Sequence, residues 1–173
     1  MADFEKKVIE KFNINALHDY QKDVIGSLCA NKSVFVCQRT GRGKGLCYQA
    51  FTTAFDTENM QESIVLVISP LISIMEEQTA YLQAKDITAV MLNQDYRKDL
   101  DAKQGRFQYI YGSPEIFLGQ SDWRDTLKSK LFQDRVQLIV IDEVHLDKCA
   151  IIAYLFSYSV STSFLFDNSL AHM

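Results

Sequence analysis

Short apolar runs alternate along the chain with stretches in which apolar residues recur every three or four positions. The short runs are typical of buried strands, and the recurrence is typical of amphipathic helices. We therefore predict strands at 33–37, 63–69, 87–92, 107–111 and 136–141. The periodic segments predict helices at 3–12, 19–30, 46–55, 70–85, 95–103 and 122–132, and a further short helix opens at Ser113-Pro114-Glu115.

Strands that alternate with helices predict an α/β fold with a mostly parallel β-sheet flanked by helices, because parallel neighbours need crossover connections. A chain of 173 residues suits one domain with a real core. We divide it into the two N-terminal helices, 1–32, a lobe that holds all five strands, 33–146, and an apolar tail, 147–173.

The tail differs from the rest of the chain. From Cys149 to Phe166 there are 18 consecutive uncharged residues, five of which are serine or threonine. That length meets the lower bound for a membrane span, but the central hydroxyl-rich block argues against insertion into a bilayer. The pattern leaves open a buried strand or helix, a poorly folded tail and, least favoured, a membrane span.

Composition narrows the class of protein only slightly. Hydrophobic residues make up 47% of the chain and its net charge is −4, so no global basic character points to nucleic acid. The four cysteines form no C-x-x-C pair, which favours reduced thiols over a disulfide framework or a zinc site. The charged N-terminus lacks a signal core, and we expect a cytoplasmic or nuclear location.

A glycine-rich turn follows the first predicted strand and leads into a helix. Residues 38–45 nearly fit the pattern G-x-x-x-x-G-K-[S/T], in which backbone N–H groups and a helix N-terminus hold phosphates and the lysine reaches the β- and γ-phosphates. Gln38 and Gly45 depart from that pattern. Such a turn alone is a weak signal, because many strand-to-helix turns bind nothing.

A second signal is the acidic pair Asp142-Glu143 at the end of the last predicted strand. Carboxylates at the carboxyl edge of a parallel sheet would lie near the glycine-rich turn, where one can hold Mg²⁺ and its neighbour can orient a water. A solvated acidic turn is the alternative for the tetrapeptide taken alone. Its position about a hundred residues after Lys44, with strands and helices between, favours the nucleotide site.

Taken together, the motifs resemble the first RecA-like lobe of RecQ-type DNA helicases, within the wider group of DEAD/DEAH-box-like helicases. The likeness covers about 12–146, and the Leu-Cys-Tyr-Gln that follows the glycine-rich turn is especially characteristic of RecQ. Five blocks occur in the family's order: Phe12 with 17–21, then 40–49, 67–78, 111–115 and 142–145.

The resemblance implies a RecA-like P-loop domain that binds ATP and Mg²⁺. In the family's pattern Gln21 would recognise adenine, Lys44 would neutralise phosphate charge and Asp142 would hold Mg²⁺, through water. Glu143 would activate the hydrolytic water, and His145 would couple the nucleotide to DNA. The residues implied in binding the nucleotide are Gln21, Thr40, Gly41, Arg42, Gly43, Lys44 and Gly45.

The resemblance also implies a 3′–5′ DNA helicase whose partner is nucleic acid. Ser69-Pro70 and Ser113-Pro114 would grip phosphates without sequence preference, although each pair taken alone is also an ordinary helix start. DNA is favoured over RNA by the family likeness alone, since no residue here is known to contact a 2′-hydroxyl. A second helicase lobe, or a full-length helicase, is a further possible partner.

The departures weaken the expected catalysis. Gly45 lacks the hydroxyl that ordinarily ligates Mg²⁺, and His18 stands where an arginine is usual. After His145 the chain resembles neither the family's aromatic-rich loop nor its second lobe, so we expect a truncated or alternatively terminated product that cannot unwind DNA alone. A pseudo-ATPase or binding module derived from a helicase is the alternative function, and a P-loop kinase or small GTPase is the least favoured.

Overall fold

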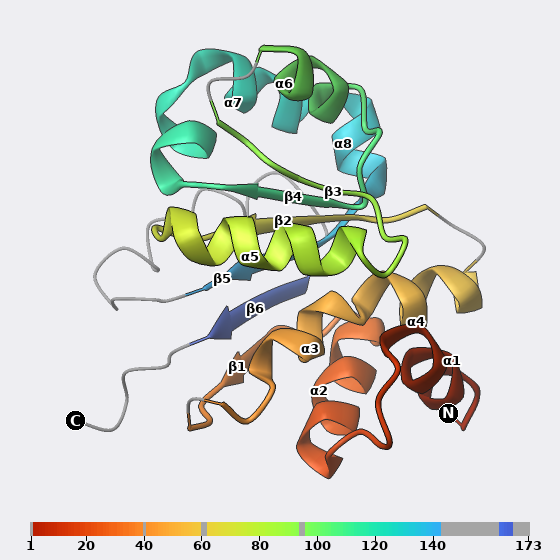
Figure 1. Ribbon diagram of the computed structural model, residues 1–173. Helices are drawn as coiled ribbons and strands as arrows, with labels where there is room; N and C mark the ends of the chain where they lie inside the picture. The colour runs from red at the N-terminus through yellow and green to blue at the C-terminus, as the bar shows by residue number, and fades with distance from the viewer. Residues whose placement is uncertain (1, 40, 60–61, 94–95, 143–162, 168–173) are drawn as a thin grey trace.

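The computed structural model describes residues 2–39, 41–59, 62–93, 96–142 and 163–167. Within them a six-stranded sheet has the order β1-β6-β5-β2-β4-β3, and every neighbouring pair is parallel (Figure 1). This confirms the expected α/β fold with a mostly parallel sheet. The strands are β1 (Val34–Val36), β2 (Ile64–Ile68), β3 (Ala89–Met91), β4 (Tyr109–Gly112), β5 (Val136–Ile141) and β6 (Ser163–Asp167).

Helices cover both faces of this sheet. Figure 1 shows α6, α7 and α8 above the sheet and α1 to α4 below it. The first five helices are α1 (Ala2–Phe12), α2 (Asp19–Cys29), α3 (Lys44–Gln49), α4 (Phe51–Asn59) and α5 (Ile72–Gln83). The others are α6 (Tyr96–Lys103), the π-helix η1 (Glu115–Gly119), α7 (Ser121–Lys128) and α8 (Lys130–Arg135).

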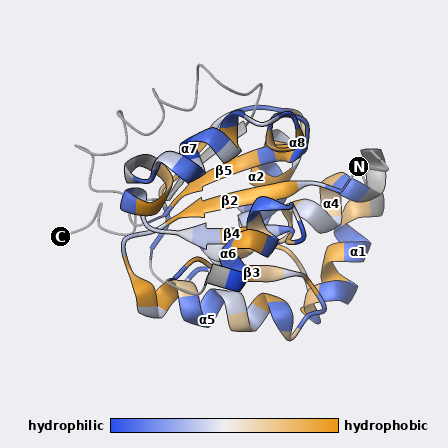
Figure 2. Cartoon of the chain, turned by 90° about the horizontal axis from the view of Figure 1, so that it is seen from above, coloured by the Kyte–Doolittle hydropathy of each residue, from blue (hydrophilic) through white to orange (hydrophobic). Residues whose placement is uncertain are grey.

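The central strands are apolar on both faces, as expected for a parallel sheet covered by helices. Every residue of β2 is buried, and Figure 2 shows β2 and β5 in the colour of apolar residues. Alternate residues of β2 belong to two different cores. Val65 and Val67 pack with α1 to α5, whereas Ile64, Leu66 and Ile68 pack with Trp123 and Phe132 of the opposite layer.

Two of the predicted helices are each divided in the structure. The 46–55 segment breaks at Ala50, where the buried Tyr109 hydroxyl lies 2.9 Å and 2.8 Å from the carbonyl oxygens of Tyr48 and Gln49. The 122–132 segment breaks at the extended residue Ser129, whose hydroxyl accepts the Phe132 N–H at the start of α8. In both places a side chain forms a hydrogen bond with a backbone group that would otherwise be paired within a continuous helix.

The predicted helix at 70–85 is also shorter at its start. Pro70 lies outside α5, which begins at Ile72 after the extended residue Leu71. The Ser69 hydroxyl accepts the Leu71 N–H at 3.4 Å, so a hydroxyl-supported turn separates β2 from the helix. Pro114, in contrast, directly precedes η1 with helical backbone angles.

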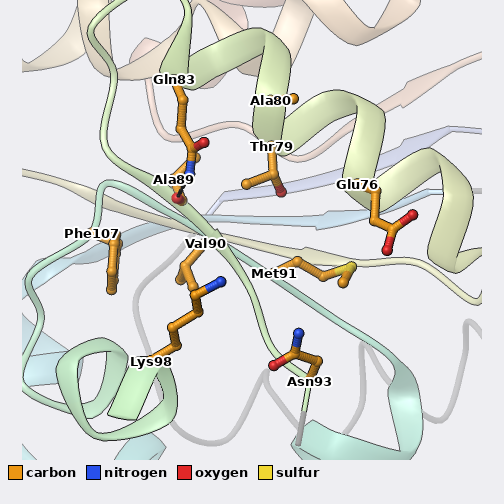
Figure 3. A pocket seen from close by; sticks show the side chains of 10 residues that line it. All are labelled: Glu76, Thr79, Ala80, Gln83, Ala89, Val90, Met91, Asn93, Lys98 and Phe107. Carbon is orange, nitrogen blue, oxygen red and sulfur yellow. Dashed lines mark hydrogen bonds between the residues drawn. The ribbon is translucent and has the colours of Figure 1, made fainter. Parts of the chain in front are cut away.

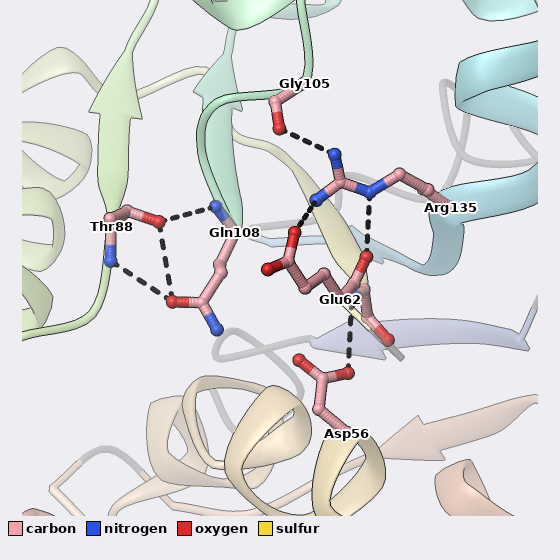
Figure 4. A network of polar contacts seen from close by, with 7 residues as sticks. Asp56, Glu62, Thr88, Gly105, Gln108 and Arg135 are labelled. Atoms are coloured by element: carbon pink, nitrogen blue, oxygen red, sulfur yellow. Dashed lines mark hydrogen bonds and ion pairs between the residues drawn. The ribbon is translucent and has the colours of Figure 1, made fainter. Parts of the chain in front are cut away.

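A polar cluster closes the end of the sheet opposite the glycine-rich turn at 38–45 (Figure 4). The Arg135 guanidinium donates to the carbonyl oxygens of Glu62 and Gly105, each at 2.8 Å. Beside them, Asp56 accepts the Ser63 N–H at 3.1 Å. One arginine therefore joins the segment before β2 to the turn before β4, which fixes where these strands enter the sheet.

One part of the tail lies within the sheet. Strand β6 pairs with β1 on one side and with β5 on the other. Among the described residues, no helix combines the length and apolar character needed to cross a membrane.

Candidate nucleotide site

The glycine-rich turn joins the end of β1 to the start of α3. Gly41 and Gly43 have φ angles of 79° and 77°, a left-handed backbone that glycine adopts with little strain. Lys44 is the first residue of α3, and its ammonium donates to the Gln38 carbonyl oxygen at 3.0 Å. The lysine side chain therefore bridges the two ends of the loop.

The loop rests on the N-terminal end of α2. Gln21 is 3% exposed; its side-chain N–H donates to the Gly43 carbonyl oxygen at 2.9 Å and its side-chain oxygen accepts the His18 N–H at 2.8 Å. The Tyr20 hydroxyl donates to the Arg42 carbonyl oxygen at 2.5 Å. Two side chains of α2 thus hold two successive carbonyl groups of the loop, and the rings of His18 and Tyr20 stack nearby, with centroids 5.9 Å apart.

Asp142 lies at the same edge of the sheet as the loop. Its backbone N–H donates to the Ile68 carbonyl oxygen at 2.9 Å, directly after β5, and its side chain is buried. The register pairs Ile141 with Phe166 in β6, and Val36 with Asp167. Asp142 therefore stands at the level of Val36, directly before the glycine-rich loop.

A buried tyrosine lies beneath this edge. Tyr111 of β4 is 1% exposed, and burial, together with the neighbouring Tyr109 and Asp142, raises the pKa of its phenol well above the usual value. The phenol therefore stays protonated at neutral pH.

Gly45 occupies the position where the motif ordinarily carries a hydroxyl. A Cβ at this position would meet Gln78 Oε1 at 3.6 Å and Gln49 Nε2 at 3.7 Å, which are ordinary contact distances. The Gln49 side chain itself donates to Gln78 Oε1, so α3 and α5 are linked beside the loop. A serine would fit here without displacing either helix.

The two Ser-Pro pairs lie at the ends of neighbouring strands. The Ser69 N–H donates to the Gly112 carbonyl oxygen at 3.1 Å, which brings the residues after β2 and β4 together. Ser69 is fully buried and its hydroxyl supports the turn, whereas Pro70 is exposed and Ser113 and Pro114 are half-buried. The surface at this edge is therefore formed by Pro70, Ser113 and Pro114.

Three of the predicted residues, Thr40, Glu143 and His145, lie outside the described residues. Sequence reasoning missed Tyr20 and the Gln49–Gln78 link. The position of Tyr20 directly before Gln21, in the first turn of an amphipathic helix, was the available signal for the former. The link between α3 and α5 carries no local signal, because its two residues are far apart in the chain.

The side chains at this edge are compatible with a Mg²⁺ ion that is bound partly by the protein and partly by the phosphates of a nucleotide. Mg²⁺ is commonly bound through one or two carboxylates, several waters and substrate phosphates, and Asp142 supplies one carboxylate at the right edge. Among the residues that the structure describes, no group of three histidine, cysteine, aspartate or glutamate side chains could form a metal site without such help.

Comparison with known proteins gives consistent results. The family model for DEAD/DEAH box helicase matches residues 18–148. The probable ATP-dependent DNA helicase RecS of Bacillus subtilis is 32% identical over 150 residues, which cover 84% of this chain and 28% of that protein. The ATP-dependent DNA helicase RecQ of Haemophilus influenzae is 33% identical, with 80% of this chain and 23% of that protein covered.

Solved structures share the fold. The DUF1998 helicase MrfA, in a crystal structure bound to DNA and AMPPNP, superposes with a TM-score of 0.73 at 17% sequence identity and covers 95% of this chain and 25% of its own. At that identity the likeness establishes the fold alone. The chain spans about a quarter of the length of the relatives that it matches.

Proposed function

Because the chain belongs to the DEAD/DEAH box helicase family and resembles its RecQ-type members, we propose that it is an ATP-binding RecA-like lobe that also contacts DNA. One observation carries the proposal. The glycine-rich loop with Lys44 and the carboxylate of Asp142 stand at the same edge of a parallel sheet, where ligands bind in open α/β folds.

The loop residues bind the triphosphate in this proposal. Backbone N–H groups between Gly41 and Gly45 point toward the phosphates, and the Lys44 ammonium exchanges the Gln38 carbonyl oxygen for phosphate oxygens. Gln21 keeps one N–H and one lone pair beyond its two bonds to the chain, so it can hold the loop and contact adenine together. Thr40 and Arg42 complete the loop.

The acidic segment positions the attacking water. Asp142 would hold Mg²⁺, and the bound ion would supply charge neutralisation of the phosphates. Glu143 accepts a proton from the hydrolytic water, and His145 connects the nucleotide to the DNA surface. These last two roles are taken from the family likeness.

The surface beside Asp142 contacts nucleic acid in this proposal. Pro70, Ser113 and Pro114 lie at adjacent strand ends, where backbone N–H groups and a hydroxyl can bind phosphates without reading sequence. The DNA helicase relatives favour DNA as the partner, within the nucleus or the cytoplasm. Unwinding with 3′–5′ polarity would require a second RecA-like lobe, wherever that lobe is supplied.

A second candidate function is a binding module that holds nucleotide with little turnover. Gly45 favours it, because glycine leaves no hydroxyl for Mg²⁺ at the position where the motif ordinarily carries one. The two candidates differ in their rate of hydrolysis and agree on nucleotide binding.

The test is ATP hydrolysis by the purified chain, with and without single-stranded DNA. We expect slow, DNA-stimulated turnover that Asp142→Asn abolishes while nucleotide binding persists. Asp56→Asn, at the opposite end of the sheet, is the matched control and should leave turnover unchanged. Turnover that is unaffected by Asp142→Asn would refute the proposed enzyme. Nucleotide binding without turnover in the parent chain would instead support the binding module.

A further inference from the structure

A cavity of about 310 Å³ lies along β3. This strand is the outermost one on the side of the sheet away from β1 and the glycine-rich loop. The cavity is formed between α5, β3 and α6, as Figure 3 shows. None of its lining residues belongs to the nucleotide site or to the Ser-Pro edge. The cavity is therefore separate from the proposed ATPase function.

The floor of the cavity is the open edge of a strand. Among the residues that the structure describes, strand β3 pairs only with β4. The bonds from Tyr109 N–H to the Thr88 carbonyl and from Leu92 N–H to the Tyr111 carbonyl show which residues face that partner. By strand alternation the peptide groups of Ala89 and Met91 face away from β4. This edge presents hydrogen-bonding groups that a further strand would pair.

One of these groups is already held by a side chain. The Gln83 amide donates to the Ala89 carbonyl oxygen at 2.8 Å. This amide takes the position that a backbone N–H of an added strand would occupy. Gln83 is an exposed residue, so its flexible side chain can be exchanged for a peptide without disturbing the core.

A buried hydroxyl supplies an independent sign of a ligand. Thr79 is 9% exposed, and its hydroxyl has no hydrogen-bond partner among the described residues. In Figure 3 this hydroxyl points from α5 toward the cavity, between Ala89 and Met91. An unpaired buried hydroxyl is costly, and a polar group in the cavity would relieve that cost.

The two walls differ in size and in charge. On the α5 side the lining residues are Glu76, Thr79, Ala80 and Gln83, of which Ala80 has the smallest side chain and Glu76 is charged. On the α6 side the wall is apolar at Phe107 and is charged at Lys98, whose ammonium points toward Val90 in Figure 3. Successive side chains of an extended peptide point to opposite faces, so they would meet these walls alternately.

We propose that this groove binds an extended peptide segment of a partner protein, which pairs with β3 as an additional strand. The peptide accepts the Met91 N–H and donates to the Met91 and Ala89 carbonyl oxygens, displacing Gln83. Apolar side chains enter toward Phe107, a hydroxyl or small side chain lies toward Thr79, and an acidic side chain faces Lys98. Main-chain pairing supplies the affinity, and the two walls supply the selectivity.

The probe is a short fluorescent peptide of alternating valine and threonine with one central glutamate, titrated into the full chain. The control peptide keeps the central glutamate and replaces the two residues that follow it by proline, so that one N–H facing the edge is lost in either register. Ala80→Trp fills the groove from an exposed position and should weaken binding about tenfold or more. Ala84→Trp, exposed at the C-cap of the same helix and outside the cavity, should not weaken it.

Amide hydrogen exchange gives a second readout that is specific to strand pairing. Exchange of the Met91 amide should slow in the peptide complex, while the fold measured by circular dichroism stays unchanged. Equal binding of the proline peptide, binding that survives Ala80→Trp, or unchanged Met91 exchange would overturn the proposal. Occupation of the cavity by small apolar compounds, with no peptide binding, would also overturn it.

Discussion

The side-chain amide of Gln21 donates to the carbonyl oxygen of Gly43 at 2.9 Å, although the two residues lie on different structural elements. Gln21 is buried at the start of α2, and Gly43 is the left-handed residue directly before α3. A helix that precedes the sheet in the chain therefore holds the glycine-rich loop in place. Helix α2 is thus part of the proposed nucleotide site.

Gln21→Glu tests this link with little change of shape. A carboxylate can still accept the His18 N–H, but it has no N–H to donate and brings negative charge against the Gly43 carbonyl oxygen. We expect the binding free energy of ATP to become less favourable by about 1–3 kcal/mol, the usual cost of an unpaired buried polar group. Isothermal titration calorimetry measures it. Lys22→Gln, one residue away on a half-exposed site, serves as the control.

Gly45→Ser should increase ATP turnover. The nearest atom to an added Cβ lies at 3.6 Å, so the substitution restores the hydroxyl without strain. We expect the rate of hydrolysis with Mg²⁺ to rise by about tenfold, because a further oxygen ligand would orient the metal. Gly45→Ala adds the same Cβ without oxygen and should leave the rate low. Equal rates for the serine and alanine variants would exclude a role for the hydroxyl.

The strands and the loop were predictable from sequence because their signals are local. Buried parallel strands such as β2 are continuous apolar runs, and a turn that needs left-handed backbone at Gly41 and Gly43 leaves a glycine pattern. The breaks at Ala50 and Ser129 were not predictable in the same way. The first depends on Tyr109, which reaches α3 from a strand distant in sequence.

The site was predictable in part for the same reason. Lys44 and Asp142 follow apolar runs that end at one sheet edge, so topology alone brought them together. The Gln21–Gly43 bond and the burial of the Ser69 hydroxyl depend on how helices pack against the loop and the turn. No periodic pattern of residues in the sequence predicts contacts of this kind.

Arg135→Ala should destabilise the fold without changing the nucleotide site. The guanidinium holds the carbonyl oxygens of Glu62 and Gly105 at the far end of the sheet. Its loss should lower the free energy of unfolding by about 1–3 kcal/mol, measured by urea denaturation. Arg124→Ala, at an exposed position on α7, should have little effect. ATP affinity in the folded Arg135→Ala protein should match that of the parent.

Stability should vary with the protonation of Asp56. Burial raises the pKa of this carboxyl above its usual value of 3.8, although bonds from Ser63 oppose the shift. Between 3.8 and the higher folded pKa, the folded state binds more protons than the unfolded state, so the free energy of unfolding rises as pH falls through this window. Above the folded pKa that contribution is lost.

Asp56→Asn should remove this dependence. The asparagine oxygen can still accept the Ser63 N–H, and the amide does not titrate in the window. Urea denaturation of the two proteins at several pH values should give a flatter pH profile for the variant. Parallel profiles would show that another carboxyl is responsible.

Substitution of Lys44 tests the central claim, which is that the glycine-rich loop binds a triphosphate at the sheet edge where Asp142 also lies. The direct measurement is ATP affinity, with Mg²⁺ present, of the parent chain, of Lys44→Ala and of Lys32→Ala, which changes an exposed lysine outside the loop. We predict that Lys44→Ala binds ATP at least about tenfold more weakly while Lys32→Ala binds it normally. Equal ATP affinity in all three proteins would contradict the account.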